Sequence, residues 1–252
     1  MKQTRLTNDK DITVKGVTVG NLKDGDVIVK GTPLADILER ILNKVADPTG
    51  SISSSISNIE IGTVLNHNIT AAFNKNDGGD LTGFVLRRNS VAVINATALQ
   101  TYNEKATIGN TAFSYQATFS YGAGASLPAG SFTSNTVTIT GRRNAFYGVN
   151  GTVTTSANIR AFTGKLLNPA NGSSFTIDIP AGATSVEFAY PDTLRDVTTV
   201  RHVETNFDVK EVFTKTLVNV EGANGFTAVG YKVYRYTPAV PFSAAQKYTI
   251  TI

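Results

Sequence analysis

The feature that most constrains this fold is a strict alternation of apolar and polar side chains. It is clearest in residues 113–121, "FSYQATFSY", where every second side chain is apolar or aromatic. A period of two places successive side chains on opposite faces of a strand, so this stretch predicts a half-buried β-strand. Short runs of the same kind recur from residue 59 onward, separated by turns rich in Gly, Asn and Asp. We therefore expect a mainly β protein.

The chain of 252 residues is long enough for two domains of ordinary size. Several short strands between 59 and 140, at intervals of about ten residues, are typical of an immunoglobulin-like β-sandwich. The sequence contains no Cys and no Trp, so the likeness would concern architecture only, without the disulfide and buried Trp of antibody domains. Residues 141–252 predict a second β-rich domain.

One helical segment is expected inside this second domain, near 156–167. Ser156 can cap its start, Asn168-Pro169 would end it, and four apolar side chains fall on one side of the expected helix: Ile159, Phe162, Leu166 and Leu167.

The first 47 residues differ from the rest of the chain. Residues 11–30 alternate around Asp24-Gly25 and predict a small β-ribbon. A helix is expected over 33–45, with Thr32 as its cap and Pro33 at its first position. Its apolar stripe consists of Leu34, Ile37, Leu38, Ile41, Leu42 and Val45. The next segment, residues 48–58, "PTGSISSSISN", has the composition of a linker.

The stripe on this helix must pack against something, because a helix of about a dozen residues is marginal in water by itself. It can pack on the β-ribbon of the same chain, or it can meet copies of itself or another protein around a symmetry axis. A hairpin and one helix form a poor core alone, which favours a partner. We therefore interpret residues 1–47 as an anchor or oligomerisation segment.

Residues with catalytic or metal-binding chemistry are few. The only histidines, His67 and His202, sit in alternating sequence, and no arrangement typical of nucleophilic catalysis accompanies them. The segment 74–80, "NKNDGGD", offers oxygen ligands for calcium but lacks a glutamate at the twelfth position, so we interpret it as a hairpin loop. We expect neither enzymatic activity nor a cofactor or metal.

Charge and hydropathy restrict the partners. The net charge is +4, and the tight basic clusters are two pairs, Arg87–Arg88 and Arg142–Arg143, which is too little for a nucleic-acid surface. No apolar run approaches the roughly 20 residues of a membrane span. The first ten residues have no apolar core of the kind that a signal peptide needs, so we expect synthesis in the cytoplasm.

Tyrosines near the C-terminus supply one candidate surface. In residues 231–236, "YKVYRY", Tyr234 and Tyr236 share one face of an expected strand, while Tyr231 and Val233 share the other. If one face is core, the other can be exposed, and exposed tyrosines stack on sugars or on a partner protein. Tyr234 and Tyr236 are therefore possible surface-binding residues.

Several segments resemble virion structural proteins of tailed phages of gut bacteria. In the C-terminal third they are 179–191, "IPAGATSVEFAYP", 218–226, "VNVEGANGF", and 231–239, "YKVYRYTPA". The stretch "DGDVIVKGTPLADILERILN" is similar to an N-terminal segment of those proteins, and "NDGGDLTGFVLRRN" and "FSYQATFSY" to their middle Ig-like domain.

This resemblance implies a fibre-like or decorating component of a phage head or tail. Such a component acts in the virion, is oligomeric with a trimer favoured, contacts other virion proteins and has no catalytic residues. The alternative function is that of an adhesin module whose C-terminal domain binds a glycan of the host surface.

Overall fold

The computed structural model describes residues 8–16, 22–42, 45–124 and 127–252. Strands hold 46% of the residues and helices 8%, so the expectation of a mainly β fold is confirmed. The chain divides into two compact units. The first comprises 1–53, 70–102 and 115–136, and the second comprises 54–69, 103–114 and 137–252. The boundary expected at 140/141 thus falls close to Val137, but two earlier segments also group with the C-terminal unit.

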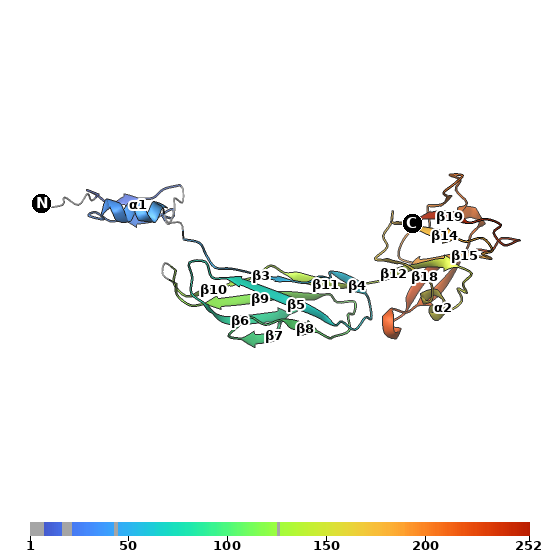
Figure 1. Ribbon diagram of the computed structural model, residues 1–252, viewed down its shortest axis with the longest axis horizontal. Coiled ribbons are helices and arrows are strands. Elements are labelled where there is room, and N and C mark those ends of the chain that lie inside the picture. The colour runs from blue at the N-terminus through green and yellow to red at the C-terminus, as the bar shows by residue number, and fades with distance from the viewer. Residues whose placement is uncertain (1–7, 17–21, 43–44, 125–126) are drawn as a thin grey trace. The chain divides into compact units, whose positions relative to one another are not determined.

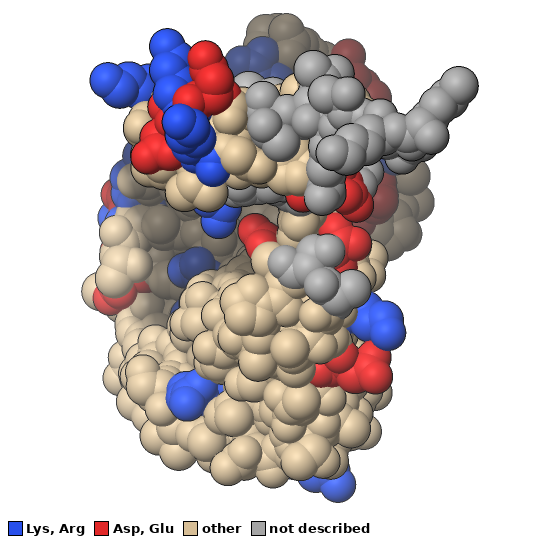
Figure 2. Space-filling model, turned by 90° about the vertical axis from the view of Figure 1, so that its left-hand side faces the viewer, with Lys and Arg blue, Asp and Glu red and all other residues tan. Residues whose placement is uncertain are grey.

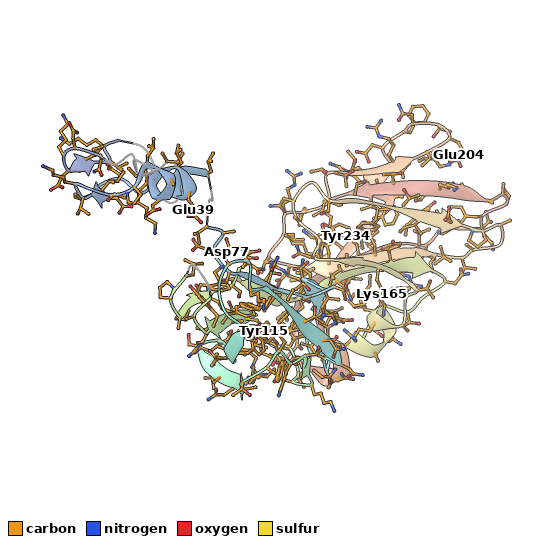
Figure 3. All side chains as sticks on the ribbon, turned by 60° about the vertical axis from the view of Figure 1, so that its left-hand side comes forward. Glu39, Asp77, Tyr115, Lys165, Glu204 and Tyr234 are labelled. Carbon is orange, nitrogen blue, oxygen red and sulfur yellow. The ribbon has the colours of Figure 1, made fainter. Side chains whose placement is uncertain are left out.

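The first unit begins with a β-ribbon and a helix. Strands β1 (Ile12–Thr13) and β2 (Val27–Ile28) pair antiparallel, and α1 (Leu34–Leu42) follows. The side chain of Asn8 donates to the carbonyl oxygens of Lys10 (2.9 Å) and Val29 (2.8 Å). Figures 1 and 3 both show the helix lying alongside the ribbon. The helix expected over 33–45 is thus observed from Leu34, and residues 43–44 of that range lie outside the described residues.

The rest of the first unit is a two-layer arrangement of strands. One layer pairs β3 with β5, and the other contains β10, β9, β6 and β7. The bounds are β3 Thr49–Ser53, β5 His67–Asn74, β6 Leu81–Arg88, β7 Val91–Ala96, β9 Phe113–Tyr121 and β10 Gly130–Thr133. The segment 74–80, expected to be a hairpin loop, instead joins strands of different layers, because β5 pairs with β3 while β6 pairs with β7 and β9.

Aromatic rings fill the space between these layers. Phe119 of β9 lies 6.0 Å from Phe73 of β5, 5.3 Å from Phe132 of β10 and 5.4 Å from Phe84 of β6, measured between ring centroids. Such offset contacts add about 0.5–1.5 kcal/mol per pair to the burial of the rings. The alternation in "FSYQATFSY" is thus realised as a strand whose odd positions Tyr115, Ala117 and Phe119 are fully buried.

The linker expected at 48–58 is wrong, because its residues 49–53 form strand β3. Ile52 is 2% exposed and its strand pairs with β5 over five residues. On the other side of Ile52 the side chain of Asn135 takes the place of a strand: its Oδ1 accepts from the Ile52 N–H and its Nδ2 donates to the Ile52 carbonyl, each at 3.0 Å. Ser and Thr, which suggested a tether, here cover the exposed face of a short strand.

The second unit contains the remaining strands and a short helix. Their bounds are β4 Asn58–Glu60, β8 Tyr102–Glu104, β11 Val137–Arg142, β12 Asn144–Val149, α2 Ser156–Arg160, β13 Gly164–Leu167, β14 Ser174–Ile179, β15 Val186–Pro191, β16 Thr199–His202, β17 Thr214–Val220, β18 Val229–Tyr236 and β19 Gln246–Thr251, with 3₁₀ turns at Lys210–Val212 and Ala223–Gly225. A five-stranded sheet has the order β13-β12-β15-β18-β17, and a three-stranded sheet has the order β14-β19-β16.

The five-stranded sheet is covered on both faces. One face carries Val186, Phe188 and Tyr234 and shares a hydrophobic cluster with residues of the three-stranded sheet, such as Ile177 and Ile250. The opposite face carries Ala189, Tyr231 and Val233 and shares a second cluster with Ile159 of α2. Burial on both faces makes β15 the most enclosed strand of the unit, and all six of its residues are buried.

The helix expected near 156–167 is correct only in its first turn. It ends at Arg160, and residues 164–167 form strand β13, in register with β12 from Asn144 to Tyr147. The cap is Thr155, whose Oγ1 accepts from the N–H of Asn158 at 3.3 Å. Ile159 and Phe162 do pack together, but Leu166 reaches the opposite face of the sheet. The spacing of the apolar residues fitted a helix, but residues 164–167 pair with the edge of β12 as a strand instead.

Strand β4 is attached within the second unit by several polar contacts. It pairs in parallel with β11, and Glu60 forms an ion pair with Arg160 of α2. The same guanidinium donates to the carbonyl of Glu221 at 2.8 Å and lies 5.6 Å from the ring centroid of Phe146. The Ile61 carbonyl accepts from the N–H of Ala223 at 2.8 Å. These contacts explain why residues 54–69 group with the C-terminal strands.

Asn135→Ala provides a test of the strand-like role of that side chain. The variant leaves the N–H and C=O of Ile52 without partners in a half-buried setting, and we expect unfolding to become easier by about 1–3 kcal/mol. Thermal denaturation followed by circular dichroism measures the change. Asn103→Ala is the control, because it removes an exposed side-chain bond to Asn68. Equal melting temperatures for the two variants would contradict this role of Asn135.

Candidate functional site

The most conspicuous apolar surface of the described residues is on α1. Leu34, Leu38 and Leu42, which we call the apolar row, are 42%, 46% and 76% exposed. Their spacing of four residues places them along one side of the helix. Exposed leucines in a continuous row are a recognised sign of an interaction surface, whereas single exposed apolar residues are ordinary.

The other residues of the expected stripe lie differently. Ile37 and Ile41 are half-buried, as is Val45 just beyond the helix. Beneath them the ribbon contributes Leu22 and Ile28, which are 4% and 5% exposed. The stripe is therefore divided by exposure: the two isoleucines are half-buried, and the three leucines are exposed. The half-buried isoleucines agree with packing on the ribbon, and association through the exposed leucines stays a prediction.

The helix that carries the apolar row, "LADILERIL", has charged residues of both signs in its sequence. Figure 2 views the molecule from the N-terminal side of Figure 1, and Lys and Arg side chains lie interspersed with Asp and Glu rather than in a patch of one sign. On the helix Asp36 lies in the first turn, where a carboxylate interacts favourably with the helix dipole. A mixed rim of this kind suits a partner with the same mixture, such as a second copy of the chain.

The structure contradicts the surface role expected for Tyr234. This side chain is 5% exposed and lies in the core between the two sheets of the C-terminal unit, where Figure 3 labels it. Its ring is stacked 4.9 Å from Phe188 and 5.7 Å from Tyr190. Its hydroxyl accepts from the Tyr190 hydroxyl and from the Val197 N–H, each at 3.3 Å. The reason is that β18 is covered on both faces, so neither set of its tyrosines is left for a ligand.

Tyr236 lies at the end of the same strand and is half-buried. Its ring packs against Phe213 at 5.6 Å and edge-on against Phe242 at 6.1 Å. These contacts extend the core between the sheets. The pair Tyr234 and Tyr236 therefore does not form an exposed aromatic platform.

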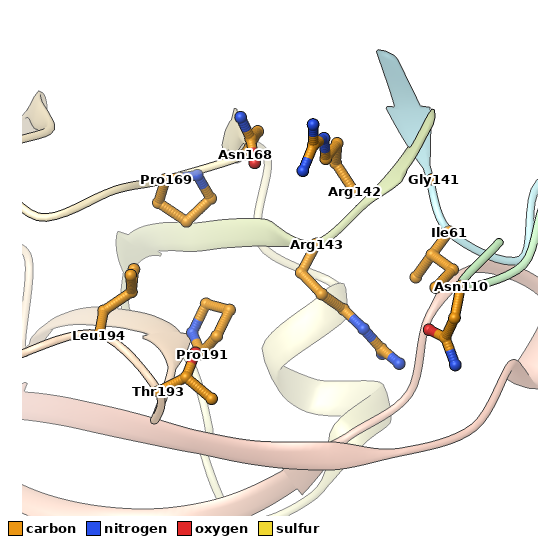
Figure 4. A pocket seen from close by; sticks show the side chains of 10 residues that line it. All are labelled: Ile61, Asn110, Gly141, Arg142, Arg143, Asn168, Pro169, Pro191, Thr193 and Leu194. Carbon is orange, nitrogen blue, oxygen red and sulfur yellow. The ribbon is translucent and has the colours of Figure 1, made fainter. Parts of the chain in front are cut away.

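A pocket of about 260 Å³ lies next to the Arg pair at 142–143 (Figure 4). Arg142 and Arg143 project in different directions, and both already have partners. Arg142 donates to Asn58 at 2.9 Å, while Arg143 donates to the carbonyls of Val220 and Thr227 at 3.3 and 2.5 Å. Burial lowers the pKa of Arg143. The two cations are used to hold neighbouring backbone, so the pocket does not present a free anion-binding group.

A larger pocket of about 440 Å³ lies beside β12 and β14. Tyr147 lines it, but one side of that ring stacks on Phe175 at 4.5 Å, and Gly164 approaches so closely that a Cβ there would lie 2.3 Å from the ring. Gly151 likewise leaves room for Phe162, since its Cβ would lie 2.1 Å from that ring. Glycines thus close off the aromatic faces that a sugar would need for stacking.

The remaining polar candidates have structural partners. His67 bonds to Ser54 at 2.8 Å, and His202 bonds to Gln246 at 2.9 Å. In the loop 74–80, Asp77 accepts from the Ala46 N–H at 2.7 Å and Asn76 donates to the Asp47 carbonyl at 2.6 Å, which holds the chain entering β3. In the described part of the chain, no cluster of three or more His, Cys, Asp or Glu residues is placed to hold a metal.

Two buried carboxylates, Glu104 and Glu187, escaped the sequence analysis, and the second faces a cation. Glu187 of β15 is fully buried, directly opposite Arg235 of β18, with 3.4 Å between Oε1 and Nε. Its Oε2 accepts from the Gly151 N–H at 3.2 Å. Burial raises the pKa of Glu187, and the Ser185 hydroxyl, the Gly151 N–H and Arg235 partly offset that effect. Alternation alone placed this residue on an exposed face, and the only hint was that Ala189 and Pro191 on the same face are not hydrophilic.

Comparison of the chain with protein-family models, with curated proteins and with solved structures found no significant match. Among the described residues, no helix is both long enough and apolar enough to span a bilayer.

Substitutions of Tyr234 should affect stability rather than binding. Tyr234→Ala removes a ring from a packed aromatic core, and we expect a loss of about 3–5 kcal/mol in the free energy of unfolding. Tyr234→Phe keeps the ring and leaves the Val197 N–H without its acceptor, for a smaller loss of about 1–2 kcal/mol. Chemical denaturation measures both. A Tyr234→Ala variant as stable as the wild type would show that the side chain is not part of the core.

Glu187 should make stability depend on pH. Its folded-state pKa is raised, so the folded protein retains a proton that the unfolded chain releases, and stability falls as pH rises from the ordinary carboxyl range through the folded pKa. Glu187→Gln removes this penalty, and its melting temperature relative to wild type should increase between pH 4 and pH 7, values that bracket the ordinary carboxyl pKa of about 4.3. Glu211→Gln, at a side chain that is 88% exposed, should show no such trend. A relative melting temperature that decreases over this range would contradict the burial effect.

Proposed function

We propose that this protein is a non-enzymatic structural component of a phage virion that assembles as a homo-oligomer through its ribbon–helix segment. The observation that carries the proposal is the apolar row on α1, whose three leucines are 42–76% exposed beside a small core of their own. Burying a leucine side chain lowers the free energy by about 1.5–3 kcal/mol, so association that covers this row is favourable.

The architecture supports a structural role rather than a catalytic one. The ribbon–helix segment is followed by β-sandwich layers and then by a three-layer β unit, and their polar side chains mainly bond to backbone groups of the same chain, as Asn135, Asn76 and Arg143 do. In this proposal the sandwich is a spacer, and the C-terminal unit is displayed or packs with other copies.

The virion context comes from the resemblance of the sequence segments to phage structural proteins. It favours a trimer and a fibre-like or decorating role on the head or the tail, with other virion proteins as further partners. Symmetric repetition suits a weak attachment surface, because linked copies gain avidity of about 10²–10⁴ over a single contact where geometry permits.

The alternative of a glycan-binding adhesin loses the residues on which it was based. Tyr234 lies in the core and Tyr236 packs on Phe213 and Phe242. No feature of the described residues favours this alternative over the structural role.

The double substitution Leu38→Gln with Leu42→Gln tests the proposal. Gln keeps helix propensity while removing apolar surface, so the fold of α1 should persist. Size-exclusion chromatography with light scattering should show an oligomer for the intact chain. The variant should associate more weakly, so that its oligomer dissociates at a protein concentration at least about tenfold higher.

The matched control is Val91→Gln with Val240→Gln, two positions that are 68% and 71% exposed and lie outside the ribbon–helix segment. It should assemble like the wild type. An intact chain that remains monomeric at about 100 µM, where an interface worth about 5.5 kcal/mol would be half-formed, would contradict self-association.

A further inference from the structure

The outer edge of β17 is a second surface to be explained. β17 is the last strand of the five-stranded sheet, and among the described residues no strand pairs with its outer side. Its inner side pairs with β18 over seven residues without a shift in register. An outer edge of this length presents a row of backbone N–H and C=O groups that can pair with another strand.

Natural proteins protect such edges with proline, bulges, short strands or charged side chains. β17, "TKTLVNV", contains no proline, and its pairing with β18 has no bulge. Its one charged residue, Lys215, is held by Asp196, with 2.7 Å between Nζ and Oδ2. Asp196 also pairs with Lys232 at 2.9 Å, so Lys215 is held in an ion pair on its own chain, in a cluster of two lysines and one carboxylate.

Other strands at the margins of pairing are better protected. The pairing of β7 with β6 contains a register shift between Leu86 and Arg87. β13 and β16 are four residues long, and β14 carries Asp178, whose side chain is 77% exposed and pairs with Lys247 at 3.0 Å. By comparison β17 is long and regular, and its one charged side chain is held in an ion pair.

The exposed face of β17 is apolar at its centre. Leu217, the middle residue of the strand, is 69% exposed. Val218 and Val220 point to the opposite face, where they pack near α2. A partner strand laid along the edge would cover Leu217 and satisfy the free backbone groups.

We propose that β17 pairs antiparallel with β17 of a second copy of this chain, about a two-fold axis at Leu217. This register uses all seven residues of the strand. It places Leu217 opposite Leu217 of the other copy, Lys215 opposite Asn219 and Thr216 opposite Val218. No like charges face each other, whereas a register centred on Lys215 would oppose two lysines, which is destabilising.

The contact is separate from the apolar row of α1, so it does not depend on the proposed function. Pairing two edges joins two five-stranded sheets into one continuous sheet across the axis. A two-fold contact in one unit and self-association through another segment would together link oligomers into larger assemblies.

The natural absence of cysteine allows a direct test in the full-length chain. In the proposed register the Cα atoms of residue 217 in the two copies lie about 4.5–5.5 Å apart, which is within the range for a disulfide. Leu217→Cys should therefore form disulfide-linked dimers under mild oxidation. Non-reducing electrophoresis should show about tenfold more dimer than for Val240→Cys, because pairing raises the effective concentration of the thiols.

Val240 is the matched control because it is a 71% exposed apolar residue outside the strands. Both variants are made in the Leu38→Gln, Leu42→Gln background, so that association through α1 does not contribute. Equal dimer yields from the two cysteine variants would overturn the proposal, whatever the outcome of the test on α1.

The register has its own test. Lys215→Cys mixed with Asn219→Cys should give a linked heterodimer, identified by mass spectrometry of the joined peptides, because these positions face each other across the axis. Each variant alone places its two thiols four residues apart along the paired strands, about 13 Å, and should link poorly. Stronger linking of either variant alone than of the mixture would overturn the antiparallel register.

A non-covalent measurement completes the test. Leu217→Lys places two ammonium groups opposite each other across the axis and should weaken pairing by at least about tenfold in dissociation constant. Val240→Lys adds the same charge at a comparable exposure and should have no effect. Analytical ultracentrifugation in the same α1-substituted background distinguishes the two, and equal dissociation constants would overturn the proposal.

Discussion

Burial of β15 and β18 on both faces is the constraint on which the C-terminal unit depends. A strand with apolar neighbours above and below must be flanked by two layers, here α2 with its preceding loop on one side and the three-stranded sheet on the other. This arrangement explains three observations together. Tyr234 is core, Gly151 is required where Phe162 approaches, and Glu187 is enclosed although its sequence position suggests exposure. The outer strand β17 lies beyond the complete cover, and its Leu217 remains exposed.

The core of the first unit is built without large helices or disulfides. It stacks phenylalanines from β5, β9 and β10 between two thin layers, and it uses polar side chains where a strand is missing. The amide of Asn135 bonds both backbone groups of Ile52 as a neighbouring strand would. Asn and Ser in this chain are therefore part of the hydrogen-bonding framework, which is why their abundance at 48–58 gave the wrong impression of a tether.

The ribbon–helix segment shows the limit of a very small core. Leu22 and Ile28 can cover only one side of a helix, so the isoleucines of α1 turn inward and the leucines stay in water. A helix of nine residues gains little stability from its own hydrogen bonds, and its remaining apolar side is most stable when covered. The exposed leucines of the segment therefore favour assembly, and this is the physical basis of the structural role proposed for the protein.

The sequence by itself determined the mainly β class, the start of α1 and the alternation that buries Tyr115, Ala117 and Phe119, because these depend on local periodicity. It also identified the six apolar residues around α1, but not which of them face inward. Only the tertiary structure decided that 164–167 is a strand, that 49–53 joins a sheet, that Tyr234 is enclosed and that Glu187 is buried. Each of these depends on which segments pack against each other. The residues that cover the second face of a strand are distant in sequence, so the alternation within the strand itself does not reveal them.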